Sequence, residues 1–167
     1  QSARATTVLV ALTSAVMVVA LALYFATGSA GRAERQDAAG RQDVLAAYDG
    51  MIAAAEALNV DELYRQVLDN DQGALAVNGQ LILTRAAALE RTRANFRNLT
   101  RVKYRVAERH VTMLGADVAV LVATGTSQAD VADGRSFSTD FVHTVVFVRR
   151  DGAWRVIHSH QSTPVPR

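Results

Sequence analysis

The chain has 167 residues, of which 50% are hydrophobic, and a formal net charge of +2. That length fits one domain of ordinary size and excludes a multidomain enzyme or a large α/β barrel. The sequence has no cysteine, which excludes disulfides, thiolate metal sites and cysteine nucleophiles. Lys103 is the only lysine among 18 Lys and Arg residues, and this arginine-rich, alanine-rich composition is typical of a GC-rich bacterial genome.

The first predicted element is a hydrophobic run without any charged residue between Arg4 and Arg32. Residues 8–26 are enough, at about 1.5 Å per helical residue, to cross the ~30 Å hydrocarbon core of a bilayer. The run therefore predicts that residues 1–31 form a membrane anchor. A cleaved signal peptide stays open, because small residues follow the run at residues 26–30, although a signal core is usually shorter, about 7–15 residues.

The hydrophobic run also sets the expected location. The arginines after the run would favour a cytoplasmic C-terminus by charge count. Short N-terminal anchors nevertheless commonly act as uncleaved export signals, so we expect a membrane-anchored domain outside the cytoplasm. If the segment is cleaved, the domain is secreted or periplasmic.

Helical patterns follow the run. Residues 32–42 are polar with small residues and indicate a linker or a frayed helix start. From residue 43 to Leu58, apolar residues recur at helical spacing and predict an amphipathic helix. Asn59 with Glu62 three residues later is the capping-box arrangement, which predicts a second, short helix.

The rest of the chain predicts a hairpin, a third helix and a sheet. Asn78-Gly79 between two short apolar runs is typical of a tight hairpin. Thr84 can cap a helix that continues to about Leu99. Period-two alternation then predicts four strands joined by short turns, at residues 102–113, 117–129, 135–149 and 153–162. These elements make residues 43–167 one α+β domain in which helices pack in a curved antiparallel sheet.

His143 is the most informative polar residue of that sheet. Alternation places it on the same strand face as Phe137, Phe141 and Val145. Burying an unpaired polar group costs about 1–3 kcal/mol, so His143 needs a partner or a cavity. It is either a satisfied core histidine or a ligand-binding or acid–base histidine in a pocket.

Two further histidines raise the question of a metal. Strict alternation puts His158 and His160 on the face of the last strand that carries Trp154 and Val156. A metal would need a third ligand from elsewhere, such as His110 or Asp140, and we predict no metal site. The sequence also has no GxGxxG motif and no Walker loop, so we predict no cofactor.

The stretch from Arg85 to Arg109 contains eight basic residues. A patch for an acidic partner or anionic lipid is one interpretation. Nucleic acid is disfavoured, because only Phe96 and Tyr104 lie nearby as aromatics and Phe96 falls on the inward stripe. We expect a solvated surface.

The C-terminal run RRDGAWRVIHSHQS, residues 149–162, resembles the closing hairpin of the nuclear transport factor 2-like superfamily. It is most similar to the SnoaL-like branch and to the association domain of calcium/calmodulin-dependent kinase II. The helix junction at residues 59–61 and the hairpin at residues 78–79 resemble features of this family and follow one another in the same order along the chain. The resemblance implies a cone-shaped, cystatin-like fold with a pocket at its open end, and a homodimer formed through the sheet.

The resemblance leaves several functions open, because members include isomerases, cyclases, dehydratases, ligand binders and assembly hubs. Our first hypothesis is a membrane-tethered or exported domain that binds a small apolar molecule or a protein partner without catalysis. The polar contacts would come from His143, Ser159 and Gln161, and Tyr48 and Tyr104 would line the pocket. The alternatives are an isomerase, cyclase or dehydratase with His143 as general base, or a structural dimerisation or envelope-complex accessory module.

Overall fold

The computed structural model describes residues 31, 34–71 and 73–164. Contacts divide the chain into two units, Gln1–Ala39 and Gly40–Arg167. The hydrophobic run at residues 8–26 lies outside the described residues. Within the described part, no helix is long and apolar enough to cross a bilayer.

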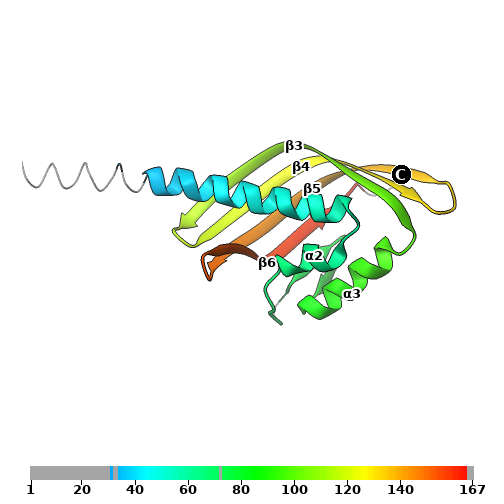
Figure 1. Ribbon diagram of the computed structural model, residues 1–167, viewed down its shortest axis with the longest axis horizontal. Helices are drawn as coiled ribbons and strands as arrows, with labels where there is room; N and C mark the ends of the chain where they lie inside the picture. Colours follow the sequence, from blue (N-terminus) through cyan, green and yellow to red (C-terminus); the bar gives the residue numbers. More distant parts are fainter. Residues whose placement is uncertain (1–30, 32–33, 72, 165–167) are drawn as a thin grey trace, which may run out of the picture. The chain divides into compact units, whose positions relative to one another are not determined.

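The second unit is built of helices on one face of a six-stranded sheet (Figure 1). A first helix spans residues 34–56, of which residues 40–56 belong to this unit. The strands of the sheet follow the order β2-β1-β6-β5-β4-β3. The later elements are α2 (Val60–Arg65), β1 (Leu75–Val77), β2 (Gln80–Ile82), α3 (Arg85–Phe96), β3 (Leu99–Gly115), β4 (Val118–Val131), β5 (Ser136–Arg150) and β6 (Ala153–Ser162).

The predicted α+β class and curved sheet are confirmed, with differences at the edges. Strands β3 to β6 form the expected antiparallel meander, but β1 pairs in parallel with β6, so the sheet is mixed. Residues 34–42, assigned to a linker or a frayed helix start, are helical. The third helix ends at Phe96 rather than near Leu99, because Leu99 already pairs with Val131 on β4.

The Asn78-Gly79 turn is confirmed by its backbone. Asn78 has φ 46° and Gly79 has φ 78°, which is the pair of left-handed residues that a type I′ hairpin turn requires. The turn joins β1 to β2 in antiparallel register. On its other side β1, whose Leu75 and Val77 line a cavity described below, pairs with β6.

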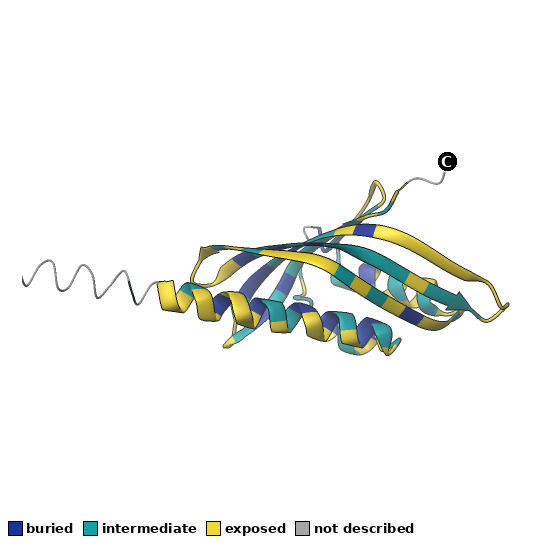
Figure 2. Cartoon of the chain, turned by 90° about the horizontal axis from the view of Figure 1, so that it is seen from above, coloured by how far each residue is buried: buried dark blue, intermediate teal, exposed yellow. Residues whose placement is uncertain are grey.

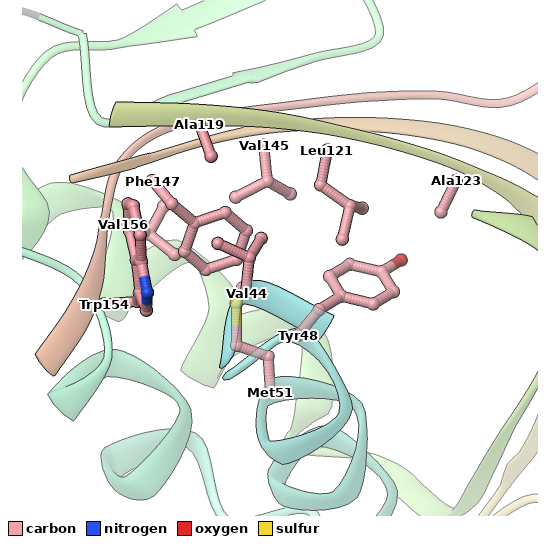
Figure 3. Close-up of a cluster of buried hydrophobic side chains, with 10 residues drawn as sticks. All are labelled: Val44, Tyr48, Met51, Ala119, Leu121, Ala123, Val145, Phe147, Trp154 and Val156. Atoms are coloured by element: carbon pink, nitrogen blue, oxygen red, sulfur yellow. The ribbon is translucent and has the colours of Figure 1, made fainter. Parts of the chain in front are cut away.

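The core lies between the first helix and the inner face of the sheet. Val44, Tyr48 and Met51 recur at helical spacing and point at the strands (Figure 3). Facing them are buried residues of β4, β5 and β6: Ala119, Leu121, Ala123, Val145, Phe147, Trp154 and Val156. Along β4, the buried residues Ala119, Leu121 and Ala123 alternate with residues of intermediate exposure, as expected for a sheet with one covered face (Figure 2).

The predicted face of His158 and His160 is wrong. Val146 pairs with His158 and Phe147 pairs with Val156, so Ile157 is an extra residue in β6, a β-bulge. One extra residue reverses the alternation. Trp154 and Val156 therefore face the core, whereas His158 and His160 share the outer face with their partners Val146 and Thr144.

We expect Asn59→Ala to lower the free energy of unfolding by about 1 kcal/mol. The Asn59 side chain accepts a hydrogen bond from the Glu62 backbone N–H at 3.0 Å, which caps α2 as the sequence predicts. Asn59→Asp keeps an acceptor and should stay near the wild-type value. Urea unfolding followed by fluorescence of Trp154, the only tryptophan, measures both variants. Equal losses in the two variants would contradict a capping role.

Candidate functional site

A cavity of about 180 Å³ lies between the helices and the inner face of the sheet. The first helix, α2 and α3 form one side of it, and β1, β3, β5 and β6 form the other. Its wall is mostly apolar, with Met51, Ile52 and Phe96 among the largest apolar side chains. The sequence-predicted site residues Tyr48, Tyr104, His143, Ser159 and Gln161 all line this one cavity.

The strand register brings three of these residues together. Gln161 pairs with His143, and Ser159 pairs with Val145, so all three side chains leave the sheet on its inner face. The bulge at Ile157 makes this possible, because it turns Ser159 and Gln161 inward after Val156. Tyr48 reaches the same point from the first helix.

His143 is hydrogen-bonded through both ring nitrogens. Its Nδ1 lies 3.2 Å from the Tyr48 hydroxyl, and its Nε2 lies 2.7 Å from Ser159 Oγ. A neutral imidazole has one donor and one acceptor nitrogen, and a hydroxyl can serve either. The protein therefore satisfies both nitrogens of this half-buried histidine internally.

Burial also determines the charge of this group. It lowers the pKa of His143 from 6.5 to about 4, and the nearby His160 acts in the same direction. Burial raises the pKa of the Tyr48 phenol well above its ordinary value. Both groups are therefore neutral at physiological pH, and an imidazole with such a low pKa is a weak general base.

Acidic groups lie away from the cavity. Among its described lining residues there is no Asp or Glu. Glu56 accepts hydrogen bonds from the Tyr104 backbone N–H and from Lys103 Nζ, and the Tyr104 bond is the main cause of its lowered pKa. Asp140 accepts a hydrogen bond from Thr126 at the surface, and the described residues hold no cluster suited to a metal.

The sequence-based interpretation missed the contribution of α3. Its cavity face carries Ala88, Arg91, Thr92, Asn95 and Phe96 at helical spacing. Thr92 Oγ1 bonds to the Tyr64 hydroxyl at 2.7 Å and so joins α3 to α2. The mixed polarity of this stripe hid it, because a hydrophobic pattern selects Leu89 and Phe96 but passes over Arg91 and Asn95.

Four of the eight basic residues in the stretch 85–109 form ion pairs. Arg93 pairs with Asp61 and Glu90. Arg101, Lys103 and Arg109 pair with Asp130, Glu56 and Asp49, respectively. These exposed pairs fit a solvated surface better than a continuous basic patch.

Tyr48→Phe should lower the free energy of unfolding by about 1–2 kcal/mol, because it leaves Nδ1 of His143 without its partner. Tyr104→Phe is the matched control on the same cavity wall. The Tyr104 hydroxyl makes no hydrogen bond within the described residues, so its loss should change stability by less than about 0.5 kcal/mol. Urea unfolding distinguishes the two, and similar losses would contradict a structural role for the Tyr48–His143 bond.

The chain belongs to the SnoaL-like domain family, whose model matches residues 44–166. No protein with a curated description matches it significantly. The solved structures similar to it share its fold, which confirms the nuclear transport factor 2-like (NTF2-like) architecture.

Three of these structures show how widely the fold is used. A candidate dehydratase of the NTF2-like family from Streptomyces avermitilis is 18% identical, with a TM-score of 0.68 over 77% of this chain and 99% of that chain. A type 2 hexachlorocyclohexane dehydrochlorinase, LinA, is 13% identical, with a TM-score of 0.68 over 79% and 90%. A candidate calcium/calmodulin-dependent kinase II association domain from Xanthomonas campestris is 22% identical, with a TM-score of 0.64 over 74% and 87%.

Proposed function

We propose that the domain binds a small, mostly apolar molecule in this cavity without transforming it. The observation that carries the proposal is the state of His143, which is neutral and hydrogen-bonded at both nitrogens while the wall around it is apolar. A concave, mostly apolar cavity with a few convergent polar groups is the usual form of a small-molecule site. The described lining residues supply no carboxylate to act with the histidine.

The competing function is an isomerase-, cyclase- or dehydratase-type enzyme. Its support is that similar structures include a candidate dehydratase and a dehydrochlorinase. At these identities the likeness concerns the fold, and one fold serves many chemistries. For catalysis, His143 would have to give up its internal hydrogen bonds and accept a proton from the substrate. The pKa of His143, about 4, makes it a weak acceptor.

Native mass spectrometry of the full chain purified from its own membranes tests the proposal. We expect a co-purifying molecule that is lost in Val77→Trp, which fills the cavity, and kept in Ala76→Trp, which alters the same strand off the cavity wall. A chain free of any such molecule would contradict binding. A released molecule that wild-type protein, but not His143→Gln, converts to a different compound, detected by chromatography that also separates isomers of equal mass, would establish the enzyme instead.

The proposal also includes where the binding domain lies relative to the membrane. We place the binding domain outside the cytoplasm, tethered by residues 8–26, because the charge-free run has the length of a membrane span. N-terminal sequencing of the mature chain distinguishes an anchor from a cleaved signal. Protease accessibility in intact spheroplasts tests the side of the membrane.

A homodimer formed through the outer face of the sheet completes the proposal. This face carries an apolar band over β4 and β5 at Val120, Val122, Val142 and Val146, and Val142 is 46% exposed. Val142→Glu would bury a charge in such an interface and should weaken dimerisation by about 100-fold. Ser138→Glu, farther along the same strand face, is the control. Native mass spectrometry reads out the dimer, and an unchanged dimer in Val142→Glu would contradict this interface.

A further inference from the structure

Arg91 is the only Lys or Arg among the described residues that line the cavity. It lies on α3, lines the cavity and is exposed, so we take this part of the wall as the mouth of the cavity. Arg93, two residues later, is paired with two carboxylates. Within the described part of the chain, no acidic group pairs with Arg91.

Further unused polar groups line the same cavity. The side chains of Asn95, Tyr104 and Gln161 make no hydrogen bond to the described residues. Asn95 follows Arg91 by one helical turn and is likewise exposed, so the two side chains share one side of the mouth. Polar groups that line a cavity without partners are expected to bind water or a ligand.

Together these groups define the charge preference of the cavity. Arg91 and Asn95 lie on its exposed side, and the rest of its wall is mostly apolar. We infer that the ligand is a small organic acid, with an apolar body held inside the cavity and a single carboxylate bound by Arg91 and Asn95 at the mouth. This inference rests on the proposed binding function and adds the chemical class of the ligand.

The position of Arg91 suits this role energetically. A guanidinium binds a carboxylate through two parallel hydrogen bonds, which are charge-assisted and directional. At the mouth both charges keep part of their hydration, so the pair avoids the desolvation cost of a buried ion pair. The apolar body supplies most of the affinity, while Arg91 selects acids over neutral analogues.

A matched pair of probes tests the inference. 2-Naphthoate and 2-naphthalenemethanol share one apolar body and differ in the anionic head. Calorimetric titration of the full chain in lipid nanodiscs, with empty discs as blank, gives the affinity for each. We expect Arg91→Gln to weaken naphthoate binding by about tenfold and to leave the alcohol unchanged. Arg97→Gln removes an exposed arginine outside the cavity wall and should change neither.

The outcomes separate the inference from the proposal beneath it. Equal binding of acid and alcohol, or naphthoate binding that is unaffected by Arg91→Gln, overturns the carboxylate inference and leaves cavity binding in place. The binding function fails, and the inference with it, if neither probe binds to the wild-type protein. It also fails if both probes bind equally well to Val77→Trp, because they would then bind outside the cavity. A loss of naphthoate affinity confined to Arg91→Gln supports both.

Discussion

Gly125→Ala is expected to lower the free energy of unfolding by about 3 kcal/mol. A Cβ at this position would lie 2.3 Å from the carbonyl oxygen of Arg105 and 3.0 Å from both Val106 Cα and Phe141 Cζ. The register of β3 against β4 shifts between Val106 and Glu108, so a bulge in β3 presses its backbone against Gly125. Two of the three close atoms belong to the backbone and cannot turn away as a flexible side chain could.

Gly50→Ala is the matched control for this substitution. Gly50 is exposed within the first helix, and a Cβ there would meet nothing within 4 Å. Alanine is favoured over glycine inside a helix, so this variant should gain about 1 kcal/mol. Urea unfolding followed by Trp154 fluorescence measures both. A loss below about 0.5 kcal/mol for Gly125→Ala would show that β3 can shift without cost.

Most of the fold was predictable because local signals agreed with one another. The cap at Asn59, the turn at Asn78-Gly79 and the period-two strands are each short-range patterns, and the structure contains all of them. The parallel pairing of β1 with β6 was not predictable in the same way. It joins residues more than 80 positions apart, and no local pattern encodes which edge of a sheet a hairpin will extend.

The candidate site was predictable where alternation held. The inward face of β5 at Phe141, His143 and Val145 follows directly from period two. Phe137 belongs to the same series but is 52% exposed, because alternation gives the face of a strand and not what covers it. In β6, the bulge at Ile157 reversed the faces, and a single sequence contains no mark of an inserted residue.

The α3 side of the cavity shows a different limit. Its stripe mixes arginine, threonine and asparagine with Ala88 and Phe96, so hydrophobic periodicity passes over it. A binding cavity needs polar groups at positions that a core would fill with apolar ones. The pattern that identifies core helices is therefore weakest where a helix borders a site.

The protein should lose about 2 kcal/mol of stability between pH 7 and pH 5 through His143 alone. Burial holds the pKa of His143 at about 4 in the folded chain, against 6.5 ordinarily. Between these values the unfolded chain binds a proton that the folded chain does not. Stability is therefore complete above about pH 6.5, falls as the pH falls through this window, and loses nothing more from this group below about pH 4.

His143→Gln should flatten this part of the pH profile, even though it loses hydrogen bonds and is less stable at pH 7. His110→Gln, at an exposed histidine of β3, retains His143 and should keep the wild-type slope. The carboxylates whose pKa values are lowered by partners, such as Glu56 and Asp130, act mainly below pH 5, so the window above it isolates the imidazole. Urea unfolding at pH 7, 6 and 5 gives the slopes. A wild-type slope that persists in His143→Gln would mean that His143 is not the group that resists protonation in the folded protein.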